Sequence, residues 1–319
     1  MKWKVPAVIA AISGVVAGGG LVLLPRAEEA NSATTTALEP SPDDPAASPA
    51  DAAAVWYDQQ VDTRLVLLEA GAKPLQTLSY QFRPDQSANV TLDMKVTQRK
   101  QANGAALEES VLPTMRVTTR YEAVGLTPEG NLRYNFHVTE ARAIQEPGLE
   151  PEVYGSAMES LNTFRVLAGY GVVTPQGVYR KVSFTTEAAE DGETARHAIS
   201  QWAVQFPQEP IGSGARWEVH QSADEGQTGR VVTYTLNEVS RSGVKLEFMN
   251  HQEKPQEPTL RNAPESLATG MLEIDLGSMT YTSDMRRTQV SQAMMMHEGE
   301  PLAVKSVVQT RVKVRPQVP

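Results

Sequence analysis

Five histidines and a complete lack of cysteine limit the metal and nucleophile chemistry open to this chain. The histidines are His137, His197, His220, His251 and His297. No two are four residues apart, so none forms the pair with which one helix face binds zinc. The residues around His137 and His220 alternate so that both would face solvent from predicted strands. Without cysteine, thiolate nucleophiles, Cys-ligated zinc and iron–sulfur clusters are excluded.

The run Met294-Met-Met-His297 has the ligand types that suit Cu(I), which are thioether and imidazole. Consecutive side chains on a strand point to opposite faces, so the three methionines cannot converge on one ion. We therefore interpret this run as sheet packing or a loop tip. The sequence predicts neither a metal site nor any other cofactor.

Two further motifs match catalytic or phosphate-binding patterns in sequence, but not in the secondary structure that those patterns require. Ser242 and Lys245 have the SxxK spacing, but that dyad needs its serine at a helix N-terminus and here the motif spans a predicted hairpin turn. Gly212-Ser-Gly214 would need a strand before it and a helix after it to bind a phosphate. The predicted order is the reverse. We therefore predict no catalytic residues and a protein that is not an enzyme.

The charge balance bears on the class of partner. Lysine and arginine number 29 against 38 aspartate and glutamate, a formal charge of −9 over 319 residues. Nucleic-acid binding rests on clustered cations, so this balance argues against a nucleic-acid partner. Hydrophobic residues make up 40%, which is enough to form a folded core over most of the chain.

The N-terminus predicts the location of the protein. Residues 5–24 carry no charge and are long enough to cross a bilayer as a helix. Lys2 and Lys4 precede them, so the N-terminus should stay in the cytoplasm and the rest should be exported. We expect residues 1–26 to be a signal anchor that holds the protein on the outer face of the cytoplasmic membrane. A cleaved signal peptide followed by secretion is the alternative.

Residues 27–54 differ in composition from everything that follows. They are rich in Ala, Pro, Ser and Thr, and they contain six acidic residues and no basic one. Such a segment has too little apolar area to offset the entropy of ordering it. We expect a disordered, fairly extended acidic tether, followed by one β-rich domain over residues 55–319.

The domain alternates apolar and polar residues with a period of two, which is typical of strands covered on one face. The alternating runs lie at 78–82, 90–96, 115–123, 132–138, 232–236, 244–248, 272–282 and 302–315. Turn residues at 83–85 and 127–130 predict hairpins between the first two pairs. Residues 252–267 read as a polar connection.

Two segments instead have helical spacing. Apolar residues recur at helical intervals from Tyr154 to Phe164 and from Ala195 to Phe206, where Pro207 ends the pattern. The sequence therefore predicts a mainly β fold, a large curved antiparallel sheet that is half-barrel or sandwich-like, with two helices covering one face.

The run Phe206-Pro-Gln-Glu-Pro-Ile-Gly-Ser-Gly-Ala-Arg-Trp217 carries a resemblance. Its Pro-x-x-Pro-hydrophobic-Gly-x-Gly-x-x-Trp pattern resembles an uncharacterised family of bacterial envelope proteins, many of them lipoproteins, over about residues 75–314. The resemblance implies an envelope location and a β-rich fold, and no reaction. This chain lacks the cysteine that the lipoprotein members acylate. The layout is also similar, in fold class only, to half-barrel lipoprotein carriers.

Two functions are compatible with these features. The first is a structural or protein-interaction role in the envelope, with an envelope protein as partner. The second is the binding or carrying of an apolar ligand, such as a lipid, in a groove between sheet and helices. A packed core with an unusual exposed patch would favour the first, and an oversized apolar lining would favour the second.

We expect the native protein to keep its first 30 residues, because residues 5–24 can span a bilayer and no clear cleavage site follows them directly. Intact-mass measurement of protein from its own cells checks this. A mass that corresponds to loss of these residues would show cleavage and secretion instead.

Overall fold

The structure is a computed structural model that describes residues 56–59, 63–102, 105–185, 202–221, 230–252, 265–297 and 300–317. All statements below concern these residues.

Strands dominate the described chain. They are β1 (Trp56–Gln59), β2 (Thr63–Glu69), β3 (Ser87–Ala102), β4 (Ala105–Val111), β5 (Met115–Leu126), β6 (Leu132–Ala143), β7 (Ala168–Val173), β8 (Tyr179–Thr185), β9 (Arg216–Gln221), β10 (Arg230–Val239), β11 (Gly243–Gln252), β12 (Glu265–Asp275), β13 (Tyr281–His297) and β14 (Glu300–Gln317). The helices are α2 (Pro151–Ser160) and α3 (Asn162–Arg165).

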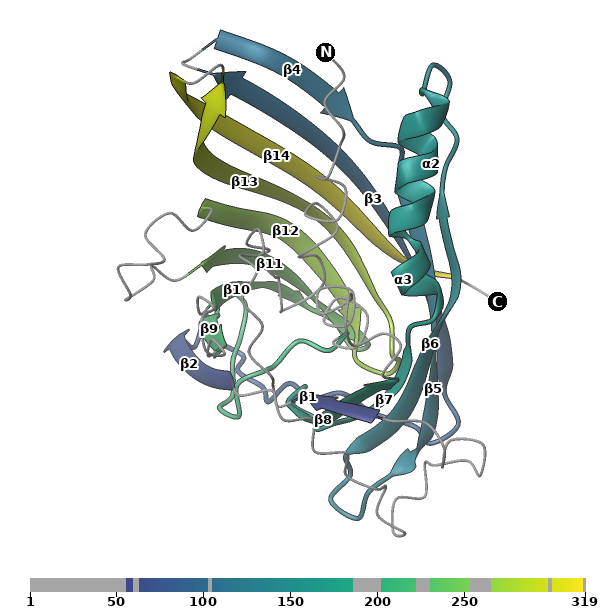
Figure 1. Cartoon of the computed structure of the whole chain (residues 1–319). Helices are drawn as coiled ribbons and strands as arrows, with labels where there is room; N and C mark the ends of the chain where they lie inside the picture. Colours follow the sequence, from purple (N-terminus) through teal and green to yellow (C-terminus); the bar gives the residue numbers. More distant parts are fainter. Residues whose placement is uncertain are drawn as a thin grey trace.

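The strands form one antiparallel sheet of 14 strands (Figure 1). Its order is β1-β8-β7-β6-β5-β3-β14-β13-β12-β11-β10-β9-β2, and β4 pairs with β3 beside this path. The sheet is strongly curved and does not close on itself. The predicted fold class is confirmed, and of the two arrangements expected it is the open, curved single sheet that the structure has.

The two edges of the sheet are joined by a very short link. β1 and β2 are consecutive in the chain, yet β1 pairs with β8 at one edge and β2 pairs with β9 at the other. Gln59 and Thr63 are four residues apart, so their Cα atoms lie within about 14 Å of each other. The sheet therefore has to bend until its first and last strands are neighbours.

Alternation sorts the side chains onto an inner and an outer face. On β14, Val312 and Val314 are buried while Arg311 and Arg315 are exposed. The apolar side chains of the inner face belong to one continuous core. The largest of them are Trp217, Tyr134, Tyr234, Phe136, Phe184 and Phe206. The expected division into one dry and one wet face is confirmed.

The hairpin expected between residues 78–82 and 90–96 is wrong. Residues 78–82 form no strand, and β3 pairs with β14, β5 and β4 instead. The backbone N–H of Tyr80 bonds to Pro175 and that of Gln81 bonds to Leu276. These partners belong to different parts of the chain, so residues 78–82 do not join a strand ladder. Its alternation reflects the burial of Leu78 and Tyr80 among the core side chains.

The prediction of a helix over residues 195–206 is wrong for residues 202–206, which the structure describes. Residues 195–201 lie outside the described part, and residues 202–206 form neither a helix nor a strand. The N–H of Ala203 bonds to the Tyr179 hydroxyl at 2.5 Å, and that of Val204 bonds to the Tyr80 hydroxyl at 2.8 Å. These donors go to buried tyrosines rather than to carbonyls one helical turn back. Trp202 and Phe206 are buried all the same.

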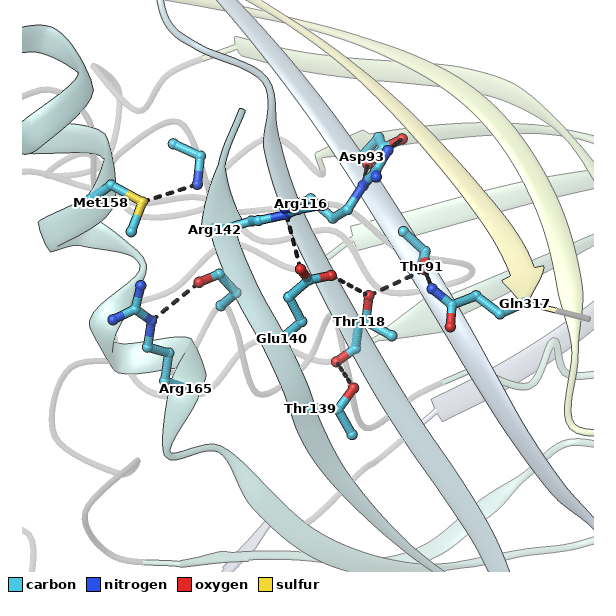
Figure 2. A network of polar contacts seen from close by, with 12 residues as sticks. Thr91, Asp93, Arg116, Thr118, Thr139, Glu140, Arg142, Met158, Arg165 and Gln317 are labelled. Atoms are coloured by element: carbon cyan, nitrogen blue, oxygen red, sulfur yellow. Dashed lines mark hydrogen bonds and ion pairs between the residues drawn. The ribbon is translucent and has the colours of Figure 1, made fainter. Parts of the chain in front are cut away.

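The other expected helix is confirmed as α2 and α3. These helices lie alongside the second half of β6, where β7 no longer pairs with it (Figure 1). Arg165 Nε donates to the carbonyl of Ala141 at 3.1 Å, and Met158 Sδ accepts the N–H of Ala143 at 3.2 Å (Figure 2). Side chains of the helices thus take over from a neighbouring strand and cover this edge of β6.

Gly212 lies where the segment before β9 meets residues 70–72, and its N–H bonds to the carbonyl of Ala70. A Cβ at Gly212 would overlap the carbonyl oxygen of Ala72, which is backbone and cannot rotate away. We expect Gly212→Ala to lower the free energy of unfolding by more than about 2 kcal/mol.

Urea unfolding of the full-length protein checks this expectation. Gly155→Ala in α2 is the control, because the Cβ position there is open, and it should stabilise by about 0.5–1 kcal/mol. Equal stability of the Gly212 variant and the wild type would contradict the close approach.

Candidate functional site

The histidines do not come together in the described part of the protein. His137, His220 and His251 lie on the outer face of β6, β9 and β11 and are half-buried. His220 Nε2 lies 3.1 Å from a carboxylate oxygen of Glu218, which shares its face of β9 as expected. The backbone of His297 belongs to β13, and His197 lies outside the described residues. Within the described ranges, no group of three His, Asp or Glu side chains could hold a metal ion.

The motifs with ligand or catalytic spacing lie in strands and a turn of the sheet. The backbone of Met294 to Met296 belongs to β13, where successive residues alternate between faces. Ser242 lies in the turn between β10 and β11, as predicted. Lys245 follows on β11 and forms an ion pair with Glu238 on β10, with Nζ and Oε2 3.0 Å apart.

The segment from Phe206 to Trp217 anchors the core. Trp217 on β9 is fully buried, and its indole N–H donates to the carbonyl of Gln205 at 3.0 Å. Gly214 has a φ of 80°, a conformation that glycine adopts without strain. Gly212 and Gly214 thus allow the backbone of this turn its path, and Trp217 anchors the start of β9 in the core.

On β14, β3, β5 and β6, polar side chains of the outer face are bonded to one another (Figure 2). Gln317 donates to Thr91, Thr91 and Thr118 lie 3.2 Å apart, and Thr118 donates to Glu140. Beside this row, Arg116 donates two bonds to Asp93, at 2.6 and 2.8 Å. This carboxylate raises the pKa of Arg116 above its ordinary value. Because these polar groups bond to one another across strands, we interpret them as stabilising the sheet and not as a ligand-binding site.

The outer face of β11 and β12 is different, because it exposes three large apolar side chains. Met249 is 43% exposed, Leu267 47% and Met271 46%. The buried residues Phe248, Leu272 and Ile274 have the opposite parity on the same strands. We call Met249, Leu267 and Met271 the outer patch.

The register of the two strands brings the outer patch together. Met249 lies directly across from Thr269, and Leu267 and Met271 are the residues two positions away on either side. Diagonal neighbours of this kind are within reach of long side chains. A group of exposed apolar side chains on a sheet face marks a binding surface more often than scattered single ones do.

A pocket of about 350 Å³ lies at the end of the same strands, beyond the outer patch. Its lining includes Glu238, Lys245, Glu273 and Asp275, together with hydroxyl side chains of the adjoining turns. The hydrogen bond to Glu238, strengthened by the nearby charge of Glu273, raises the pKa of Lys245. Lys245 is thus held protonated, which is the opposite of what a lysine acting as a base needs.

The outer patch borders β13, and β14 follows as the next strand. Arg311 donates to Asp284 through Nε at 3.0 Å and through a second guanidinium nitrogen. This bond, and the cations Lys313 and Arg286 nearby, lower the pKa of Asp284. Charged groups therefore lie next to the outer patch on β13 and at the end of β11 and β12.

Sequence reasoning missed the outer patch. Residues 252–267 were expected to be a polar connection, whereas β12 already begins at Glu265 and includes Leu267. Met249 and Met271 have the parity of the wet face, and that departure from alternation was the available signal. The closeness of Met249 to Met271 depends on strand register, which cannot be predicted from the sequence pattern alone.

No protein-family model and no curated protein matches this chain. Within the described residues no helix is both long and apolar enough to cross a membrane, and residues 5–24 are outside that part.

Exposure of the outer patch predicts how neighbouring residues respond to truncation. Met249→Ala should change the free energy of unfolding by no more than about 0.5 kcal/mol, because the side chain is exposed. Phe248→Ala, one residue earlier and buried, should cost about 3–5 kcal/mol. Chemical unfolding of both variants checks this. Similar losses in the two would show that Met249 is covered by the protein itself.

Proposed function

We propose that this chain is an exported, membrane-tethered envelope protein with a non-catalytic protein-interaction role, and that the outer patch is its binding surface. The observation that supports it best is the exposure of Met249, Leu267 and Met271 side by side on one face. Their exposure costs solubility and gives the fold nothing, since the core lies on the opposite face. A partner that covers these side chains would explain why they are apolar and exposed.

Membrane tethering is proposed from the sequence. Residues 5–24 have the length and apolarity of a bilayer-spanning helix, and residues 27–54 follow as an acidic segment. β1 begins at Trp56, directly after this segment. At about 3.1 Å per residue, 28 extended residues reach roughly 90 Å. The β domain would then meet partners in the envelope while attached to the outer face of the cytoplasmic membrane, or freely if the signal is cleaved.

The alternative function is the binding or carriage of a lipid or other apolar ligand, and a curved open sheet is compatible with it. The described inner face supports it less well, because the protein's own rings occupy part of it. Trp202 packs against Tyr80 and Tyr134, with ring centroids 5.6 and 5.9 Å apart. The segment expected to form one of the covering helices is not helical over residues 202–206. The interaction role is therefore the better-supported proposal.

Site-specific photo-crosslinking in the protein's own cells tests the interaction role. A photoreactive phenylalanine analogue replaces Met249 or Met271 in the full-length chain. We expect a discrete protein adduct from each position, because a bound partner would bury both. Val166, an apolar residue that is 48% exposed and lies outside the sheet, is the control position and should give none.

Three results are informative. Adducts from positions 249 and 271 but not from 166 support an interaction surface at the outer patch. Adducts with lipid rather than protein would favour the apolar-ligand alternative. Equal, diffuse labelling at all three positions would remove the basis for the proposal.

A further inference from the structure

Methionine is the sulfur-containing residue of this protein, because the chain has 11 methionines and no cysteine. No thiol of the protein therefore competes with methionine for an oxidant. The structure describes the side chains of seven of them, which are Met94, Met115, Met158, Met249, Met271, Met279 and Met285. Among these seven, Met249 and Met271 are the two that are exposed, at 43% and 46%.

The other five described methionines are protected by the fold. Four belong to the core and are at most 5% exposed, namely Met94, Met115, Met279 and Met285. Met158 is half-buried, and its Sδ already accepts the N–H of Ala143 at 3.2 Å. A soluble oxidant reaches a buried sulfur only when the fold opens locally or globally. The structure therefore separates two reactive methionines from five protected ones.

The two reactive methionines lie together on the outer patch. Met249 is directly across from Thr269, and Met271 follows two residues later on β12. Oxidation of a methionine places a polar S–O group on what was an apolar thioether. If both are oxidised, Leu267 is the one apolar member of the outer patch that remains. The polarity of this surface thus depends on the oxidation state of two side chains.

We propose that Met249 and Met271 are a paired oxidation site, and that their oxidation by a peroxide turns the outer patch from apolar to polar and releases its partner. The proposal rests on the interaction role described above and adds its regulation. It names a modification that acts on the binding surface and leaves the core untouched, because both side chains lie outside the core.

The chemical step is an oxygen-atom transfer. The thioether sulfur attacks one oxygen of hydrogen peroxide, an S–O bond forms, the O–O bond breaks, and water leaves. The sulfur loses two electrons and the peroxide gains them. A methionine sulfoxide reductase reverses the step, in which two thiols are oxidised to a disulfide and the oxygen leaves as water. The modification is therefore reversible.

Isotope-labelled peroxide tests the selectivity of the site. The purified full-length protein is treated with ¹⁸O-labelled hydrogen peroxide, and the label in each methionine peptide is followed by mass spectrometry. We expect Met249 and Met271 to react at least about tenfold faster than the four core methionines, because reactivity follows exposure. In urea, where the fold no longer protects any of them, the seven rates should converge. Folded-state rates at Met249 and Met271 no higher than those at Met94 and Met115 would overturn the proposal.

Photo-crosslinking in the protein's own cells tests the effect on the partner. A photoreactive phenylalanine analogue replaces Thr269, which is exposed and lies between the two methionines. We expect peroxide to remove the protein adduct when Met249 and Met271 are present. In the Met249→Leu/Met271→Leu background the outer patch is apolar and cannot be oxidised, so the adduct should persist in peroxide. Met249→Gln/Met271→Gln makes the surface polar and should lose the adduct without any oxidant.

The readouts separate this proposal from the interaction role. An adduct that persists after Met249 and Met271 are oxidised, or one that peroxide removes equally from the leucine background, overturns the oxidation switch and leaves the interaction role standing. No adduct from position 269 in untreated cells refutes the interaction role and the switch together. Circular dichroism checks that the oxidised protein and each variant keep the sheet, and a double variant that loses it is replaced by Met271→Leu or Met271→Gln alone.

Discussion

The link between β1 and β2 is the constraint on which the rest of this fold depends. Two strands that follow each other in the chain pair at opposite edges of a sheet of 14 strands. The sheet satisfies this only by curling, and curling creates an inside with a limited volume. Large aromatic rings such as Trp217 and Tyr234, whose centroids are 5.4 Å apart, fill that inside together with residues from the extended segments before β3 and β9.

The inner face carries the core, so the outer face is the one whose side chains meet solvent. On one half of that face, polar groups such as Asp93 and Arg116 bond to each other across strands. On the other half the same alternation leaves Met249 and Met271 exposed. Buried side chains specify the fold on one side of each strand, and the other side is free to vary. This separation explains how the chain can expose apolar residues without loss of stability.

Periodicity predicted the fold class because it reports which face of a strand is dry, and the alternation of Val312 and Val314 with Arg311 and Arg315 is a direct case. It failed for Tyr80 and Trp202. Both are buried as their patterns suggest, but the backbone beside them bonds to tyrosine hydroxyls and distant carbonyls that no local window contains. The outer patch was out of reach for a related reason. Leu267 and Met249 are 18 residues apart, and only the pairing of β11 with β12 makes them neighbours.

The short first strand also determines how the fold carries mechanical load. A pull on the chain ahead of Trp56 reaches the sheet through β1, whose ladder with β8 has four residue pairs. Beyond the link, the load passes to β2 at the opposite edge, where the pairing with β9 is longer. Tension would therefore separate β1 from β8 before it disturbs the aromatic core or the outer face. The four residue pairs between β1 and β8 are thus the part of the sheet that yields first to a force on the N-terminal side of the domain.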